Sequence, residues 1–282
     1  MCNDKLNIEF YSQKEEGVVL DTIVAFIDKS DIDNPAIKEA AEVIKKGGLV
    51  AFPTETVYGL GANALDAAAV EKIFLAKGRP QDNPLIIHVA DKDVSPYVKK
   101  VPPLAKELMD AFWPGPLTII LEKSSIVPDK TSANLDTVGL RMPSSPIALK
   151  LIAESGVPIA APSANISGRP SPTDMERCVE DLKGRVDYIL GGEMSAVGVE
   201  STIIDCSVEP PCILRPGAVT LEMLQEVRKD IYIDPSLLEK PKDNLKPKAP
   251  GMKYKHYSPA ADVAAADDVL PVLGTLTVEE MA

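Results

Sequence analysis

The segment that decides the fold is residues 34–66, NPAIKEAAEVIKKGGLVAFPTETVYGLGANALD. It opens with Asn34 and Pro35, a helix cap followed by a first-turn proline. Apolar side chains then recur on one helical face, at Ile37, Ala40, Ala41 and Ile44. Gly47 and Gly48 end the run, so the pattern predicts a helix between Pro35 and these glycines.

The residues after this helix predict the layout of an α/β protein. Residues 49–52 predict a short buried strand, residues 53–63 a polar loop, and Asp66 the cap of the next helix. The alternation of strands and helices continues, which predicts the α/β class. Further strands are predicted at 85–89, 117–121, 138–141, 158–161, 188–190, 202–206 and 213–215, and further helices at 103–112, at 147–153, after a capping-box pattern at 173–176, and after Thr220.

Both ends of the chain differ from this regular centre. The first thirty residues are expected to be irregular, and from about residue 234 the sequence turns rich in proline and lysine, as a linker does. The predicted division is an N-terminal extension (1–33), a catalytic domain (34–230), a linker (231–259) and a remnant of a C-terminal domain (260–282). Only 23 residues follow Pro259, too few for a core of their own.

Composition argues against several functional classes. The net charge of −12 argues against a protein that wraps nucleic acid, because Lys and Arg drive phosphate binding. Four cysteines without a Cys-x-x-Cys pair, and only two histidines, argue against a thiol-rich metal site. No stretch approaches the roughly 18 apolar residues of a membrane span, and the polar, acidic residues 1–16 are unlike a signal peptide. We therefore expect a cytoplasmic protein with no membrane contact.

Four polar clusters follow predicted strands or helices, where α/β proteins bind ligands. They are residues 53–61, residues 77–85, residues 161–173, and residues 198–202 together with 214–217. The second cluster carries Lys77 and Arg79, cations suited to phosphate oxygens, and Arg141 is a similar cation at a strand end. The third enters a helix, a place that binds anions. Each cluster could also be an ordinary surface loop, and His88, judged by spacing alone, is more typical of a buried core residue.

Common catalytic motifs are absent from the sequence. It contains no phosphate loop of the GxxxxGK[ST] type, no GxSxG nucleophile elbow, no HExxH metal motif and no GxGxxG dinucleotide turn. What remains is a site rich in cations and hydroxyls without an evident activated nucleophile. Such a site suits a reaction that depends on positioning and charge neutralisation.

In this order, the clusters resemble the YrdC-like family of threonylcarbamoyl-adenylate synthases. The hallmark of that family is Lys-x-Arg followed much later by Ser-x-Asn, here Lys77, Arg79, Ser163 and Asn165. The resemblance spans residues 34–228 and implies a twisted open mixed sheet with flanking helices. It also implies that L-threonine, bicarbonate and ATP are condensed to threonylcarbamoyl-AMP and pyrophosphate for tRNA modification. In longer members a linker like residues 249–259 leads to a second domain, of which this chain is expected to hold a remnant.

The resemblance also implies roles for individual residues. Lys77 and Arg79 are the expected catalytic residues, and each is expected to be an unpaired cation at the pocket mouth that contributes little to folding. Magnesium is expected to arrive with ATP rather than at a protein metal site, and Tyr254 or His256 to close over the nucleotide. Residues expected to bind L-threonine are Thr54, His88, Arg141, Ala161 and Ser201. Residues expected to bind ATP are Arg79, Asn83, Thr137, Ser163, Asn165, Ser171, Arg215 and Tyr254.

Two alternatives stay open at this point. One is a related enzyme that makes carbamoyl-adenylate, although acylphosphatase and zinc-finger segments like those of hydrogenase-maturation proteins are not found in the sequence. The other is a module that binds double-stranded RNA or nucleotides, against which the acidic balance counts. Transferases that modify tRNA are the expected downstream partners, and direct contact with tRNA is left open.

Overall fold

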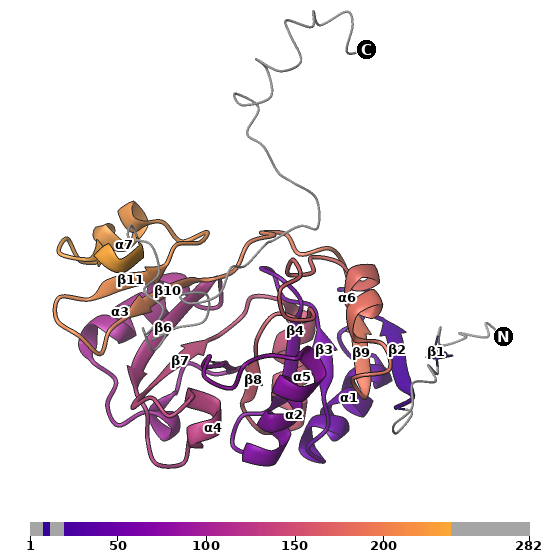
Figure 1. The fold of residues 1–282 in the computed structure, drawn as a ribbon. Helices are drawn as coiled ribbons and strands as arrows, with labels where there is room; N and C mark the ends of the chain where they lie inside the picture. The colour runs from indigo at the N-terminus through magenta and orange to yellow at the C-terminus, as the bar shows by residue number, and fades with distance from the viewer. Residues whose placement is uncertain (1–7, 12–19, 238–282) are drawn as a thin grey trace, which may run out of the picture.

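A computed structural model describes residues 8–11 and 20–237 of the chain (Figure 1). The strands are β1 (Ile8–Tyr11), β2 (Thr22–Phe26), β3 (Val50–Phe52), β4 (Gly59–Asn63), β5 (Ile86–His88), β6 (Leu117–Glu122), β7 (Thr137–Arg141), β8 (Ile159–Ala161), β9 (Tyr188–Gly191), β10 (Thr202–Asp205), β11 (Cys212–Arg215) and β12 (Tyr232–Ile233). The helices are α1 (Pro35–Lys45), α2 (Ala67–Lys77), α3 (Pro103–Phe112), α4 (Asp129–Ser132), α5 (Pro146–Ser155), α6 (Met175–Leu182) and α7 (Leu221–Val227), with 3-10 turns η1 (Ser95–Tyr97) and η2 (Pro235–Leu237).

The described strands form one open sheet. Their order is β1-β2-β9-β3-β4-β8-β5-β7-β6-β10-β11-β12. The sheet contains both parallel pairs, such as β5 with β7, and antiparallel pairs, such as β5 with β8. The predicted α/β class and the mixed open sheet are confirmed.

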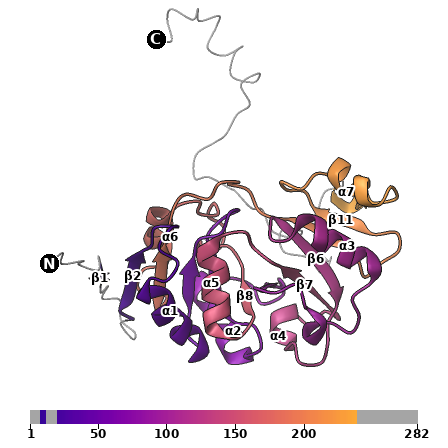
Figure 2. The same ribbon diagram turned by 180° about the vertical axis from the view of Figure 1, so that it is seen from behind.

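Side chains alternate between the two faces of the sheet and build two large cores and a smaller cluster of Ile86, Ile120, Ile203, Cys212 and Leu214. Val24 and Ala51 belong to the core under α2, α3, α6 and α7, whereas their neighbours Ala25 and Val50 belong to the core under α1 and α5. The helices α1 and α5 pack side by side, as the opposite views in Figures 1 and 2 agree. Most central strands are therefore buried on both faces, which favours a polar ligand site where strands end.

The helix ends follow the local signals in the sequence, with one correction. The side chains of Asn34 and Asp66 accept hydrogen bonds from the first backbone N–H groups of α1 and α2, as predicted. The predicted cap of α6 in the pattern at 173–176 was Thr173, but the structure places Asp174 at the cap, where its side chain accepts from Arg177 N at 2.9 Å. The helix therefore begins one residue later than the capping-box pattern implied.

Two predicted irregular segments are strands. The loop predicted over 53–63 contains β4. Its glycines are uncommon in strands, so the sequence did not indicate a strand there. A Cβ on Gly61 would lie 2.6 Å from Ile159 Cγ2, so close packing explains the glycine. The first thirty residues contain β1 and β2, and β2 pairs with β9, more than 160 residues away, so no local signal marks it. The sheet thus continues on both sides of residues 34–230, and the domain division stays a prediction.

No helix among the described residues is long and apolar enough to span a membrane.

Candidate active site

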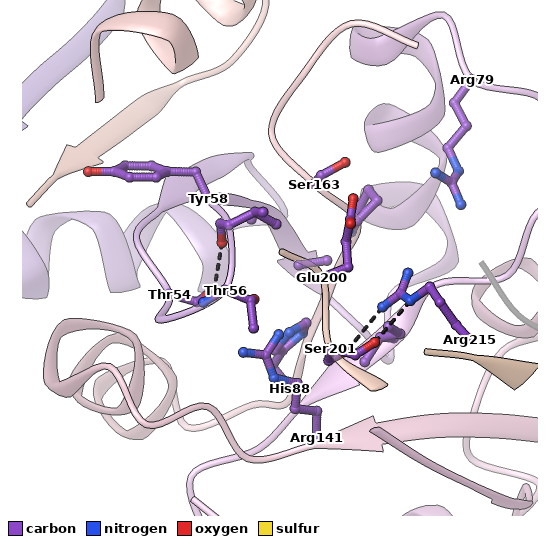
Figure 3. Close-up of a pocket in the computed structure, with 15 residues that line it drawn as sticks. Thr54, Thr56, Tyr58, Arg79, His88, Arg141, Ser163, Glu200, Ser201 and Arg215 are labelled. Carbon is purple, nitrogen blue, oxygen red and sulfur yellow. Dashed lines mark hydrogen bonds between the residues drawn. The ribbon is translucent and has the colours of Figure 1, made fainter. Parts of the chain in front are cut away.

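A pocket opens at the middle of the sheet, where the ends of several strands meet (Figure 3). His88 and Arg141 come from the ends of the parallel strands β5 and β7, and Arg215 from the end of β11. The loop after β3 forms the facing wall. The residues that line this first hollow are Thr54, Thr56, Val57, Tyr58, Gly59, Arg79, Ile86, His88, Arg141, Ala161, Pro162, Ser163, Glu200, Ser201 and Arg215.

All five residues expected to bind L-threonine line the first hollow, although they are spread over almost 150 positions of the chain. Thr54 Oγ1 donates to the carbonyl of Val57 at 2.6 Å and lies 2.9 Å from Thr56 Oγ1. Ser201 Oγ lies 2.7 Å from Thr118 Oγ1. These buried hydroxyls are held in place by neighbouring groups, which gives the wall a fixed pattern of donors and acceptors.

Arg141 forms a buried ion pair. Its Nη2 lies 2.7 Å from Glu55 Oε1, and the two side chains are only 5% and 9% exposed. Its Nε donates to the carbonyl of Gly115 at 3.3 Å. The ionic contact lacks hydrogen-bond alignment, so neither Arg141 Nη2 nor either Glu55 oxygen has a hydrogen-bond partner among the described residues. Buried donors without partners are rare, and one in a pocket points to a ligand that accepts from it.

His88 is neutral in this setting. Its ring lies edge-on to Phe52, with ring centroids 6.2 Å apart. Burial, and next the charge of Arg141, lower the pKa of His88 to about 3. Its Nδ1 has no hydrogen-bond partner among the described residues. His88 can therefore orient a ligand by hydrogen bonding, but it is a poor base at neutral pH.

A second hollow of about 360 Å³ adjoins the first, because Arg79 and Ser163 line both. The expected ATP residues Asn83 and Asn165 line it, together with Lys77. Gly168 and Arg169 of the loop between β8 and α6 form its other side. The second hollow thus unites the Lys-x-Arg and Ser-x-Asn motifs, which lie more than 80 residues apart in the sequence.

The expectation of an unpaired Lys77 at the pocket mouth is wrong. Lys77 is only 2% exposed, and its Nζ donates to the carbonyl of Ser163, to the carbonyl of Asn165 at 2.5 Å and to Asn165 Oδ1 at 3.4 Å. Burial, and next the charge of Arg79, lower the pKa of Lys77, while Asp181 opposes the shift. The ammonium replaces water with main-chain carbonyls because the loop folds directly over the end of α2. Lys77 therefore anchors this loop.

The Ser-x-Asn motif is also engaged in holding its own loop. Ser163 Oγ donates to Asn165 Oδ1 at 2.5 Å, and the Asn165 amide donates to the carbonyls of Ile166 and Arg169 at 2.9 and 2.8 Å. From α6, Asp181 accepts from Ile166 N at 3.0 Å and from Arg169 Nη1 at 2.5 Å. The loop is thereby fixed in one shape before any ligand binds.

Arg215 links the first hollow to β10. Its Nε donates to the carbonyl of Ser201 at 2.9 Å and its Nη2 to Ser201 Oγ at 3.0 Å, the contacts drawn as dashed lines in Figure 3. Burial lowers the pKa of Arg215 to about 10, so the group stays protonated at neutral pH. A half-buried, charged guanidinium at this wall suits an anionic ligand.

Two of the described residues expected to bind ATP, Thr137 and Ser171, lie outside both hollows. Thr137 lines a small neighbouring pocket with largely apolar walls, which shares Ile86 with the first hollow. Ser171 lines neither hollow, but its hydroxyl donates to Glu200 Oε1 at 2.8 Å. Tyr254 lies outside the described residues, as does His256.

The residue-by-residue expectations missed several residues of the first hollow or its rim. Thr56, Tyr58 and Glu200 line the hollow, and Glu55 holds Arg141 beside it. Each of these residues lies inside a polar cluster recognised in the sequence, so its cluster membership was the available signal. The roles remained hidden because an ion pair such as Glu55 with Arg141 joins two clusters that only folding brings together.

These features define a class of protein. The first hollow carries three arginines, several hydroxyls and a neutral histidine, and the part of the chain that the structure describes holds no group of three or more His, Cys, Asp or Glu residues able to bind a metal. Such a pocket belongs to an α/β enzyme that positions anionic substrates.

Comparisons with known proteins narrow this class. The Sua5/YciO/YrdC family model, described as "Telomere recombination", matches residues 42–217, so the chain belongs to this family. A second model, described as "Threonylcarbamoyl-AMP synthase, C-terminal domain", matches residues 219–271. The predicted family and the predicted enzyme class, a threonylcarbamoyl-AMP synthase, are confirmed by the relatives that follow.

Threonylcarbamoyl-AMP synthase of Pyrococcus abyssi is 52% identical over 237 residues, which are 84% of this chain and 69% of the relative. The enzyme of the same name from Bacillus subtilis is 48% identical over 247 residues, covering 86% of this chain and 70% of the relative. A crystal structure of P. abyssi Sua5 complexed with L-threonine matches with a TM-score of 0.81 and 48% identity, over 89% of this chain and 74% of that one.

Proposed function

We propose that the two hollows together bind L-threonine, bicarbonate and ATP, and that the protein condenses them to threonylcarbamoyl-AMP and pyrophosphate. The observation that carries the proposal is that the two hollows share wall residues. The five expected threonine residues line the first hollow, and Arg79 and Ser163 belong to it and to the second hollow as well. The similarity to a synthase solved with L-threonine supports this arrangement.

In this proposal the first hollow holds L-threonine. The carboxylate of the amino acid accepts from Arg141, whose Nη2 has no hydrogen-bond partner among the described residues. Thr54 and the neutral His88 face the threonine hydroxyl, and the small Ala161 leaves room for its methyl group. L-serine lacks that methyl group, so it should bind more weakly by about 1 kcal/mol.

The chemistry proceeds in two steps. The free amine of threonine attacks the carbon of bicarbonate, a C–N bond forms, and water leaves to give N-carboxy-threonine. An oxygen of this new carboxylate then attacks the α-phosphorus of ATP, and the bond to the β-phosphate oxygen breaks to release pyrophosphate. No covalent enzyme intermediate is required, so the residues act by placing charge and shape.

Arg79 and Arg215 are placed to stabilise charge on the phosphates. Lys77 acts differently from the original expectation, because its ammonium is engaged by the loop at 163–165. We assign it the role of holding that loop against the nucleotide. Thr137 beside its apolar pocket is available to the base, and magnesium would enter with ATP.

The product would be passed to transferases that modify tRNA, and the proposed location of the protein is the cytoplasm. The proposed unit that performs the reaction is the catalytic domain at residues 34–230, extended by the strands on either side of it.

The test is pyrophosphate release by the purified full chain with ATP, magnesium and bicarbonate. Release should depend on L-threonine, fall with L-serine, and stop when bicarbonate is removed. Release that is independent of bicarbonate, or equal with all amino acids, would contradict the proposal. The Arg141→Met variant should not release pyrophosphate in response to L-threonine.

A further inference from the structure

Glu200 is the acidic residue that lines the first hollow among the described residues. It shares that wall with Arg79, Arg141 and Arg215. In Figure 3 its side chain points into the same space as Arg79 and lies between Ser163 and Ser201. A carboxylate beside Arg79 and Arg215, the arginines assigned to the phosphates, is unexpected, because like charges repel more strongly where water is excluded.

No neighbouring arginine forms an ion pair with Glu200 among the described residues, although Arg215 lies near enough for the charge of Glu200 to oppose the lowering of its pKa. Arg141 pairs with Glu55 and Arg215 donates to Ser201, and no ion pair of 4.0 Å or less joins Glu200 to any described residue. Its one hydrogen bond within the described residues comes from Ser171 to Oε1. The second oxygen, Oε2, therefore keeps its lone pairs for another partner.

The backbone fixes Glu200 in this place. A Cβ on Gly217 would lie 2.6 Å from the carbonyl oxygen of Glu200, so the chain after β11 packs directly against this residue. The next residue, Ser201, is held by Arg215 through both its carbonyl and its hydroxyl. The carboxylate is thus presented from a rigid wall, oriented by Ser171, rather than from a free loop.

A fixed carboxylate beside phosphates repels them unless a cation lies between, and Arg215, already engaged by Ser201, is the described cation whose charge is coupled to that of Glu200. Magnesium is commonly bound by one or two carboxylates together with substrate phosphates, and keeps several waters. The absence of a larger His, Cys, Asp or Glu cluster in the described part of the chain fits this mode, because the phosphates would supply the other ligands.

We propose that Glu200 is the protein ligand of the divalent cation that accompanies ATP, with Oε2 facing the metal and Ser171 orienting the carboxylate through Oε1. This inference rests on the proposed function. The site is completed only by the nucleotide, so the protein alone should bind the cation weakly.

The experiment is calorimetric titration of ATP into the full chain, without threonine or bicarbonate, once with magnesium and once with a chelator. Magnesium should tighten ATP binding by the wild type. In Glu200→Gln this metal-dependent gain should shrink by at least about tenfold, whereas metal-free ATP should bind as well or better because a repelling charge is gone. Glu200→Asp, with a shorter carboxylate, should fall between the two.

Two variants separate this role from simpler ones. Glu122→Gln makes the same change at an exposed carboxylate on β6 and should behave like the wild type. Ser171→Ala removes the hydrogen bond to Glu200 but keeps its charge, so it should retain most of the metal dependence. If Ser171→Ala and Glu200→Gln lose the same metal-dependent gain, Glu200 is only a partner for Ser171 and the proposal is overturned.

Paramagnetic resonance of manganese gives a readout independent of turnover. Bound Mn²⁺ should increase when ATP is added to the wild type, and should increase much less with Glu200→Gln. ATP binding with equal metal dependence in the wild type and Glu200→Gln would overturn this inference alone. Failure of the wild type to bind ATP at all would instead overturn the proposed function, and this inference with it.

Discussion

The two hollows of the pocket differ in how their signature residues are used, although Asn83 Oδ1 in the second is also buried without a hydrogen-bond partner among the described residues. In the first, Arg141 Nη2 and His88 Nδ1 are buried without hydrogen-bond partners among the described residues. In the second, Lys77, Ser163 and Asn165 are engaged in hydrogen bonds that hold the loop between β8 and α6. The first hollow therefore keeps side-chain groups in reserve for a small polar ligand, whereas the second uses its signature residues to shape a cradle.

This difference changes how mutations should be interpreted. Removing a reserved group should reduce binding, and removing a group that shapes the loop should reduce stability and binding together. The five predictions that follow test this distinction, from the largest expected effect to the smallest.

The largest effect is expected for Arg141→Met. It removes the expected partner of the threonine carboxylate and leaves the Glu55 carboxylate buried and unpaired, which costs about 3–5 kcal/mol of stability. Threonine binding should be lost in calorimetry, and chemical denaturation should show the stability loss. The double variant Glu55→Gln with Arg141→Met should recover much of the stability but none of the binding. Recovery of binding in the double variant would show that Arg141 serves only Glu55.

The second largest effect on stability and ligand binding is expected for Lys77→Met. The substitution keeps the aliphatic stem but leaves the carbonyls of Ser163 and Asn165 without their donor, at a cost of about 1–3 kcal/mol. Hydrogen exchange should speed up in residues 163–169, and ATP affinity should fall with it. The control is Lys38→Met at an exposed position of α1. Unchanged exchange in this loop would contradict the anchoring role.

The third prediction concerns pH. The pKa of His88 is about 3 in the folded protein against its usual 6.5, so the unfolded chain binds the extra proton between these values. The contribution of His88 to stability therefore falls as pH drops below about 6.5, by roughly 2 kcal/mol between pH 7 and pH 5. Denaturation at these two pH values should show the drop, and His88→Gln should lack this share of it. An equal drop in both proteins would assign the effect to other groups.

The fourth prediction concerns the cap of α6, the helix from which Asp181 holds the loop at 163–169. Asp174→Ala removes the side-chain acceptor of Arg177 N and should cost about 1 kcal/mol. Thermal unfolding would measure this loss. The neighbouring Thr173→Ala should cost much less, and the reverse order would support the capping-box reading instead of the structure.

An effect on stability no larger than that of Asp174→Ala is expected for Ser201→Ala. The hydroxyl contacts Thr118 Oγ1 and receives one donor of Arg215, while the main-chain contact of Arg215 Nε with Ser201 remains. We expect a stability change of about 1 kcal/mol and a larger loss in threonine binding, measured by calorimetry. A stability loss with intact binding would place Ser201 among the groups that only shape the wall.

Much of the fold could be predicted because its signals are local. The helix α1 follows from Asn34, Pro35 and apolar residues at helical spacing, and the helices α2, α3 and α5 follow in the same way. The sequence did not predict the strands β2 and β4. The strand β2 depends on a partner far along the chain, and glycine is required in β4 because side chains of other strands pack closely against it. Local rules cannot register a contact that only folding creates.

The features of the site also fall into those that local sequence predicted and those that depend on folding. Its polar clusters were evident in the sequence, and the ordered set identified the family. The ion pair of Arg141 with Glu55, the burial of Lys77 and the position of Glu200 in the first hollow were not evident. Each depends on distances between segments that lie far apart in the chain, and charge and burial determine whether such a group binds a ligand or holds the fold.

By itself, then, the amino-acid sequence determined the α/β class, most helix and strand positions, and the residue types available for anionic substrates. Only the tertiary structure decided which of these residues face a ligand and which support their neighbours. The physical reason is that a side chain's chemistry is intrinsic, but its partners, its exposure to water and its pKa are set by what folding packs against it.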